Sequence, residues 1–293
     1  MSKPFGGVLN ALATPFTDNG EAVDLPRLGR LVDDVIEAGV HGIIPCGSTG
    51  EFNSMTTAER KQVAEAVVER VGGRVPVVPH TGALTAREAI DLSRHAESVG
   101  ADGVMLVAPF YEPLNVNEAK HYYRTVAEAV SLDIVIYNLP VATGVNLQPH
   151  DVAELAQQVP NIRYIKDTSG DFSQATRLIH DYGDNITTFV GLDTLFFASA
   201  VEGAAGTIVG SANFIGRQLV DVWTSAKAGD LENARKMWDA VYPVMQFLTE
   251  VGYVTGVKAA MKLLGDSVGD PRRPYEVLEG HKLAELTAIL RAG

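Results

Sequence analysis

The chain has 293 residues, of which 46% are hydrophobic, so it is long and apolar enough for one large or two small domains with a full-sized core. Its formal net charge of −12 at pH 7 argues against binding to nucleic acid, which needs a basic face, but leaves room for a small anionic substrate. A single cysteine, Cys46, excludes an internal disulfide framework. The sequence shows no apolar leader and no apolar run long enough to span a membrane, so we expect a soluble, cytoplasmic protein with no membrane association.

Strand-like and helix-like segments alternate along the first two thirds of the chain. Apolar β-type runs are expected over 8–13, 40–46, 75–78, 103–108, 134–137, 162–166, 186–190 and 206–209. Helices are expected between them, over 26–38, 57–71, 85–99, 117–130, 149–158, 172–181 and 194–201. This alternation favours a parallel (β/α)8 TIM barrel. The main competitor, a doubly wound open sheet, would usually carry a glycine-rich dinucleotide fingerprint after its first strand, and none is present.

The C-terminal part of the sequence shows only helical patterns, over 215–228, 231–251, 257–264 and 282–291. A typical barrel needs about 250 residues, so this tail is an appendage rather than a second domain. We therefore expect a barrel over 1–212, and C-terminal helices over 213–293 that comprise the last barrel helix and an extension packed on the barrel.

One lysine stands apart from the others at the end of an expected strand. Of the nine lysines, Lys166 alone closes an apolar β-type run, and the other eight are expected near the N-terminus or on surface helices. Barrel enzymes place their chemistry at the C-terminal ends of the strands. Desolvation of an ammonium there favours the neutral amine, which can attack a carbonyl. A snorkelling or salt-bridged lysine is the alternative interpretation.

Two further strand ends carry candidate functional groups. The turn Gly47-Ser48-Thr49-Gly50 offers backbone N–H groups and hydroxyls to an anion, although it could simply connect a strand to a helix. Tyr137 could act as a general acid/base beside Lys166, or could be a core tyrosine. Cys46 and Glu51 flank the turn and are expected to be structural, Glu51 by capping its own turn or the following helix start.

Taken together, several motifs point to one family. They are Gly47-Ser48-Thr49-Gly50-Glu51, Tyr137-Asn138-Leu139-Pro140 with Thr143-Gly144, Ile165-Lys166-Asp167, and Thr14-Pro15-Phe16 with Gly20 and Asp24. They resemble the dihydrodipicolinate synthase/N-acetylneuraminate lyase family over essentially the whole chain, and the first three, in this order and spacing, are the most specific. The resemblance implies a class I (β/α)8 aldolase or dehydratase that binds pyruvate or another 2-oxo acid to a lysine as a Schiff base. It also implies a homotetramer that uses no metal and no organic cofactor.

The resemblance assigns an expected role to each matching residue. Lys166 would form the Schiff base, and Tyr137 would shuttle the proton. Ser48 and Thr49 would bind the carboxylate of the 2-oxo acid. Tyr111 would reach into the site of a neighbouring subunit and complete a hydroxyl relay with Tyr137 and Ser48.

The remaining matches and mismatches bear on the substrate. Ile208 would lie with its backbone against the bound oxo acid. Ala142 stands where dihydrodipicolinate synthases usually have an arginine for the aldehyde's carboxylate, and a methyl group cannot replace that contact. Asp193 matches a sugar-binding aspartate of sialic acid lyases, but Thr194 and Gly210 replace their glutamate and serine. We therefore expect a lyase for another hydroxylated 2-oxo acid, such as a 2-keto-3-deoxy sugar acid, with 4-hydroxy-tetrahydrodipicolinate synthase as the alternative.

Two other functional classes can be weighed against this one. A metal-dependent aldolase would need clustered ligands, and the best candidates, His41 and His80, fit no short metal motif. A non-catalytic 2-oxo-acid-binding relative would have no chemical reason to keep the lysine, the tyrosine and both hydroxyls of the turn. We therefore expect an enzyme with no metal site.

Overall fold

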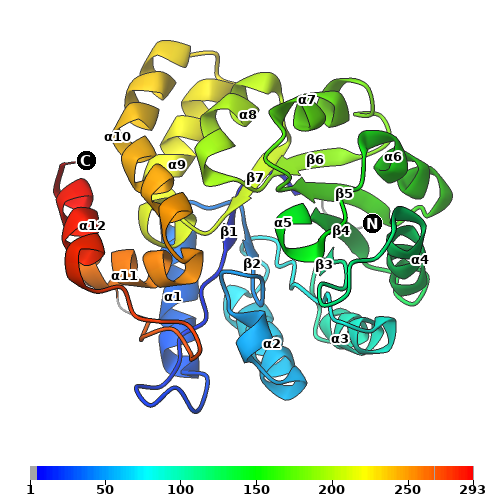
Figure 1. Cartoon of the computed structure of the whole chain (residues 1–293), viewed down its shortest axis with the longest axis horizontal. Coiled ribbons are helices and arrows are strands. Elements are labelled where there is room, and N and C mark those ends of the chain that lie inside the picture. The colour runs from blue at the N-terminus through cyan, green and yellow to red at the C-terminus, as the bar shows by residue number, and fades with distance from the viewer. Residues whose placement is uncertain (1–4, 267, 293) are drawn as a thin grey trace.

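The computed structural model describes residues 5–266 and 268–292, and within them the strands form one parallel sheet. The strand order is β2-β1-β7-β6-β5-β4-β3. The strands are β1 (Gly7–Ala11), β2 (Gly42–Ile44), β3 (Gly103–Val107), β4 (Asp133–Asn138), β5 (Ile162–Asp167), β6 (Thr187–Val190) and β7 (Gly206–Val209). Figure 1 shows them at the centre of the molecule with helices around them. The architecture is that of a (β/α)8 barrel with additional C-terminal helices, as the sequence predicts.

The gap between β2 and β3 is bridged by a segment that forms no regular strand. The sequence predicts a strand over 75–78, but only two isolated parallel bridges form there, one to each neighbour. The reason is that Pro76 and Pro79 have no N–H group to donate to a ladder. Backbone bonds still tie the segment to both neighbours, so the barrel is nearly closed. The two bridges pair Ile43 with Val77 and His80 with Met105.

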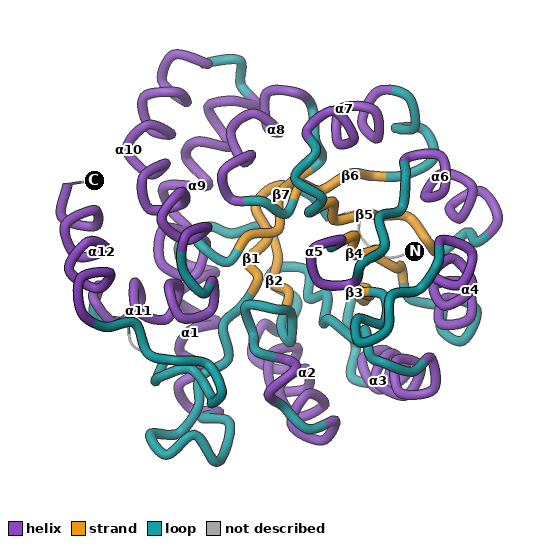
Figure 2. The backbone as a smooth tube through the Cα atoms, viewed as in Figure 1, coloured by secondary structure: helices purple, strands orange, loops and turns teal. Residues whose placement is uncertain are grey.

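Helices cover the outside of the barrel between successive strands, and the tube in Figure 2 shows this ring around the strands. The predicted helices are confirmed to within a few residues. The capping box that starts the second helix uses Thr56, whose side chain accepts from the N–H of Glu59 at 3.2 Å. The helices are α1 (Leu25–Glu37), α2 (Thr57–Val71), α3 (Ala86–Ser98), α4 (Val116–Ala127), α6 (Pro149–Gln158), α7 (Phe172–His180), α8 (Phe196–Glu202) and α9 (Ala212–Lys227). A short helix, α5 (Pro140–Thr143), follows β4.

Three more helices form the C-terminal extension beside α9, at the left of Figure 1. They are α10 (Leu231–Glu250), α11 (Tyr253–Leu264) and α12 (Gly280–Ala292). The helical character of the tail is therefore confirmed, whereas the division of the chain into 1–212 and 213–293 stays a prediction. Within the described residues, no helix is both long enough and apolar enough to cross a lipid bilayer.

The barrel interior is filled by side chains that alternate along the strands. Large side chains such as those of Tyr164 and Phe189 occupy this interior, and both are almost fully buried. Two residues beyond Tyr164, the same inward direction places Lys166 nearer the C-terminal end of the barrel. The fold thus directs this lysine into the barrel rather than into solvent.

Candidate active site

Lys166 and Tyr137 are brought together by the register of β4 and β5. The two residues are paired across these strands, and each is 5% exposed. The Lys166 Nζ lies 4.1 Å from the centroid of the Tyr137 ring. An amine and a phenol therefore meet at the inner wall of the barrel, where a nucleophile and an acid/base would be needed together.

The space around the Lys166 side chain depends on Gly191, directly after β6. A Cβ added to Gly191 would lie 2.5 Å from Cε of Lys166 and would also collide with the hydroxyl of Thr168. Real Cβ atoms do not approach that closely, so only glycine leaves room for the lysine stem in this position.

Lys166 differs from the other buried lysines in its charge environment. The expectation that all other lysines lie near the N-terminus or on the surface is wrong for Lys120 and Lys258, which are 8% and 3% exposed. Each of those two forms an ion pair 2.5 Å long, with Glu154 and Glu51 respectively. Among the described residues, no carboxylate forms such a pair with Lys166. Its amine is therefore buried without a counter-ion in direct contact, which separates it from the salt-bridged alternative.

The turn after β2 has an unusual backbone that presents two hydroxyls. Thr49 is 5% exposed and Ser48 is half-buried. They lie between Cys46 and Glu51, whose φ values of 60° and 57° fall in the left-handed region that non-glycine residues rarely adopt. Such conformations persist only where the surrounding structure enforces them, and they concentrate at functional sites.

Side chains beneath this turn fix it in place. The Thr14 hydroxyl donates to the Gly50 carbonyl at 2.7 Å. The Val107 N–H donates to Nε2 of His80 at 3.3 Å, so the ring proton lies on Nδ1, which donates to the Cys46 carbonyl at 3.0 Å. Burial lowers the pKa of His80 well below its usual value, in agreement with a neutral ring. His80 therefore supports the turn.

The two histidines considered as metal ligands do not lie together. Both ring nitrogens of His80 form hydrogen bonds with the backbone. His41 directly precedes β2, and its Nδ1 accepts from the Val8 N–H at 3.1 Å. In the described part of the chain, no group of three or more His, Cys, Asp or Glu is placed to bind a metal ion. These two histidines thus lend no support to the metal-dependent interpretation.

Asp193 is held by the backbone of Ser211 and by Tyr253, and sequence reasoning did not identify the tyrosine. Asp193 is 3% exposed, and it accepts from the Tyr253 hydroxyl at 2.6 Å and from the Ser211 N–H at 3.4 Å. The Tyr253 hydroxyl in turn accepts from the Gly210 N–H at 2.9 Å. Burial raises the pKa of Asp193, while its hydrogen bonds and the charge of Lys166 act in the opposite direction. Tyr253 begins a helix of the C-terminal extension, and no motif around it signals this role.

Asp167 belongs to one of the matching motifs and directly follows Lys166, but the sequence assigned it no role. Its carboxylate accepts from Asn138 at 2.9 Å, from Ser169 at 2.9 Å and from Gln174 at 3.1 Å. Burial raises the pKa of Asp167. Because Asn138 directly follows Tyr137, this network ties together the strand ends that carry the amine and the phenol.

Ala142 lies on α5, at the rim of a pocket of about 190 Å3 that also reaches Ser48. Tyr275, between α11 and α12, also lines this pocket, and its hydroxyl lies 2.9 Å from Nδ2 of Asn53. None of the described lining residues is lysine or arginine. They are Ser48, Phe52, Asn53, Val107, Phe110, Leu139, Ala142 and Tyr275.

The remaining predicted site residues differ in position. Ile208 on β7 is fully buried in the barrel interior, in the same cluster as Tyr137. Tyr111 follows β3 and is 81% exposed, so it is not packed into the Lys166 site of its own chain. The structure therefore brings the amine and the phenol together within one chain, and leaves Tyr111 on the surface.

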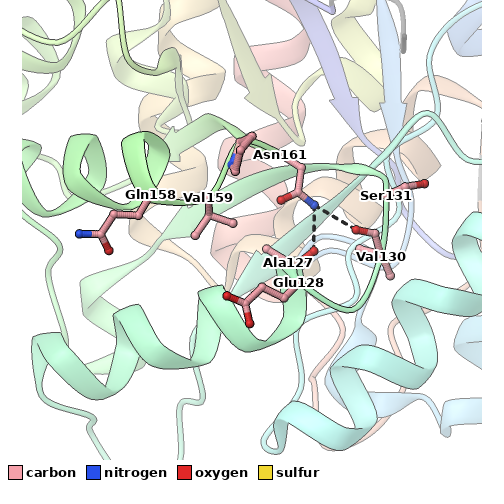
Figure 3. Close-up of a pocket in the computed structure, with 8 residues that line it drawn as sticks. Ala127, Glu128, Val130, Ser131, Gln158, Val159 and Asn161 are labelled. Carbon is pink, nitrogen blue, oxygen red and sulfur yellow. Dashed lines mark hydrogen bonds between the residues drawn. The ribbon is translucent and has the colours of Figure 1, made fainter.

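A second pocket, of about 400 Å3, lies beyond the opposite ends of β4 and β5 (Figure 3). The Asn161 amide donates to the carbonyls of Ala127 and Val130 at 2.9 and 3.2 Å. Glu128 is the one ionisable side chain among its described lining residues. None of these described lining residues is a lysine, and the pocket lies at the N-terminal end of the strands, so it is not the Schiff-base site.

A nearly closed parallel barrel with a buried lysine beside a tyrosine, and with no carboxylate paired to that lysine among the described residues, is the arrangement expected of a class I lyase, which forms a Schiff base with a carbonyl substrate. Comparison with known proteins agrees with this class. Residues 4–293 match the model of the dihydrodipicolinate synthetase family, and the chain belongs to that family.

Individual relatives cover almost the whole chain. It is 37% identical to a 4-hydroxy-tetrahydrodipicolinate synthase from Methanoculleus marisnigri, with 98% of each chain aligned. It is also similar to YagE, a protein of the dihydrodipicolinic acid synthase family from E. coli whose structure was solved in complex with pyruvate. The TM-score is 0.93 and the identity 32%, and the match covers 99% of this chain and 98% of YagE. A dihydrodipicolinate synthase from Thermotoga maritima gives a TM-score of 0.93, 30% identity and 98% coverage of both chains. The chain is thus a class I pyruvate-type lyase, and a non-catalytic role is not favoured.

Proposed function

We propose that this enzyme cleaves or dehydrates a hydroxylated 2-oxo acid, such as a 2-keto-3-deoxy sugar acid, through a Schiff base at Lys166. The observation that carries this proposal is the buried amine of Lys166, held against the ring of Tyr137 with no carboxylate paired to it among the described residues. Such an amine is accessible to a carbonyl carbon without first breaking an ion pair.

The proposed reaction uses the amine and the phenol in sequence. Lys166 attacks C2 of the 2-oxo acid, and loss of water gives a protonated imine. Tyr137 gives its own proton to the departing water, and its phenolate then takes the proton from the C4 hydroxyl as the C3–C4 bond breaks. The bonding electrons pass to C3 and the imine to form an enamine. An aldehyde leaves, C3 is reprotonated, and water hydrolyses the imine to release the shorter 2-oxo acid. A well-placed acid/base contributes a factor of about 10²–10⁴ to such a step.

The other residues are proposed to bind and orient the substrate. Ser48 and Thr49 would donate to its carboxylate from the turn, and Ile208 would contribute backbone along the oxo acid. Asp193 would accept from substrate hydroxyls, because a carboxylate offers about four acceptor sites and the two hydrogen bonds described above leave others free. A site that bonds a hydroxyl can reject an analogue without it by about 10⁴–10⁵.

The lining of the pocket that contains Ala142 is the basis for the proposed choice between a hydroxylated 2-oxo acid and aspartate semialdehyde. Its described lining offers no cationic side chain to a second carboxylate, so a substrate with an uncharged distal end suits it better than aspartate semialdehyde. The names of the relatives favour the second candidate, 4-hydroxy-tetrahydrodipicolinate synthase, which would condense pyruvate with aspartate semialdehyde.

The two candidates are separated by kcat/KM over a panel of hydroxylated 2-oxo acids and of pyruvate with aspartate semialdehyde. We expect wild-type enzyme to prefer a hydroxylated 2-oxo acid, and Ala142→Arg to gain activity with aspartate semialdehyde. Wild-type enzyme that condenses aspartate semialdehyde best would establish the second candidate instead.

We also propose that the working form is a homotetramer in which Tyr111 completes the site of a neighbouring chain. Its 81% exposure leaves the ring free to enter another chain, and the apolar lining of the pocket beside Ser48 suits an incoming aromatic ring. A cytoplasmic location stays a prediction.

A further inference from the structure

A buried ion pair connects the turn after β2 to the C-terminal extension. Nζ of Lys258, on α11, lies 2.5 Å from Oε1 of Glu51, and the two side chains are 2% and 0% exposed. The other carboxylate oxygen of Glu51 accepts from the Arg272 N–H at 2.8 Å. The expectation that Glu51 caps its own turn is therefore wrong, because its carboxylate binds residues more than 200 positions away in the sequence.

Glu51 is also the last residue of the strained turn. Its left-handed backbone, together with that of Cys46, bounds the stretch that presents Ser48 and Thr49. Cys46 is fixed through its carbonyl by His80, and Gly50 is fixed through its carbonyl by Thr14. At the Glu51 end the anchor is the Glu51 side chain, and its partners among the described residues lie on α11 (Lys258) and between α11 and α12 (Arg272).

Each side chain of this pair needs the other to stay charged in its buried position. Burial raises the pKa of Glu51 and lowers that of Lys258, and their mutual attraction opposes both shifts. Lys258 is further held over the ring of Phe16, 4.6 Å from the centroid, and it donates to the Asp270 carbonyl at 3.3 Å. Breaking one side of such a pair leaves an uncompensated buried charge, which the structure relieves by moving or by taking in water.

We propose that the Glu51–Lys258 pair positions the residues that bind the substrate's carboxylate. Through this pair, the C-terminal extension fixes Ser48 and Thr49 in place. The inference rests on the carboxylate-binding role proposed above for these two residues. Without the pair, the left-handed end of the turn would relax, and its hydroxyls and N–H groups would no longer converge on one anion.

The test compares Lys258→Met and Glu51→Gln with a matched control, Lys120→Met. Lys120 is also a buried lysine in a 2.5 Å ion pair, but it lies on α4 and its partner Glu154 lies on α6. Pyruvate affinity is measured as the concentration that gives half-maximal borohydride trapping, and turn order as amide hydrogen exchange of the peptide that spans residues 46–51. The melting temperature of each variant shows how much general stability it has lost.

We expect Lys258→Met and Glu51→Gln to raise the half-saturating pyruvate concentration about tenfold or more and to speed exchange in the 46–51 peptide. The yield of adduct at saturation should stay near one per chain. Lys120→Met should lower the melting temperature without either change. Unchanged exchange and unchanged affinity in both pair variants, or equal changes in Lys120→Met, would overturn the proposal. If wild-type enzyme traps no 2-oxo acid while exchange still rises in the pair variants alone, the proposed function fails and the positioning of the turn stands.

Discussion

Lys166 and Tyr137 are register partners on adjacent parallel strands, and the amine of one lies 4.1 Å from the ring centroid of the other. Their backbones are joined by the β4–β5 ladder, so their relative position does not depend on a flexible loop. Just beyond them, the carboxylate of Asp167 accepts from the Asn138 amide at 2.9 Å and fastens the same two strand ends. The central pair is thus built on rigid elements and supported from outside the barrel.

Tyr137→Phe separates the two roles of this tyrosine. Phenylalanine keeps the ring against Lys166 but removes the hydroxyl that would carry the proton. We expect borohydride trapping with pyruvate to remain, while kcat for bond cleavage falls by about 10²–10⁴, the usual contribution of a placed acid/base. The two are measured on the same preparation. A variant with wild-type kcat would assign Tyr137 to the core instead.

Gly191→Ala tests the space reserved for the lysine stem. The added Cβ would lie 2.5 Å from Cε of Lys166, so the amine must move from the Tyr137 ring or the strand end must shift. We expect adduct formation at saturating pyruvate to become at least tenfold slower. Gly29→Ala on α1 is the matched control, because its Cβ would meet only the Arg70 side chain at ordinary contact distances and alanine favours helix. Normal adduct rates in Gly191→Ala would contradict this account of the site.

Tyr111 tests whether the site is shared between chains. If its hydroxyl completes the neighbour's relay, Tyr111→Phe should lower kcat more than it raises the half-saturating 2-oxo acid concentration. Sedimentation at assay concentration should show an oligomer. A monomer with full activity would remove Tyr111 from the mechanism.

His80 predicts a specific loss of stability in mild acid. In the folded protein its pKa lies well below the usual value, while in the unfolded chain it is about 6.5. Below pH 6.5 the unfolded state therefore binds a proton that folded His80 does not, and folding loses up to about 1.4 kcal/mol per pH unit until the folded pKa is reached. Urea unfolding of wild type and His80→Gln at pH 7.5, 6.5 and 5.5 measures this difference. The wild type should lose more stability than the variant over that range, and parallel curves would contradict the neutral buried ring.

The sequence was most informative where a pattern is local. Periodicity placed α2 and α6 at their observed bounds, and the strand-end lysine and tyrosine followed from their own segments. The prediction of a strand over 75–78 was wrong because two prolines lack the N–H groups that a ladder needs, although the segment still lies between its two neighbouring strands. Propensity alone could not have shown that tertiary bonds to both neighbours would preserve the barrel.

Contacts between residues far apart in the sequence were the main feature that the sequence could not predict. Tyr253 reaches Asp193 across 60 residues, and Lys258 reaches Glu51 across 207 positions in the numbering. Neither contact leaves a periodic or motif signal in either segment, because each is created only when the C-terminal helices dock beside the barrel. For the same reason, surface-helix patterns could not distinguish Lys258 from an exposed lysine.

The central claim is that Lys166 forms a Schiff base with a 2-oxo acid. The most direct measurement is incubation of the enzyme with pyruvate and borohydride, followed by intact-mass and peptide mass spectrometry, with Lys166→Ala in parallel. We predict one pyruvate-derived adduct per wild-type chain, on Lys166, and none in the variant, which should remain folded. An adduct on a different lysine, or no adduct with any 2-oxo acid tested, would contradict the account.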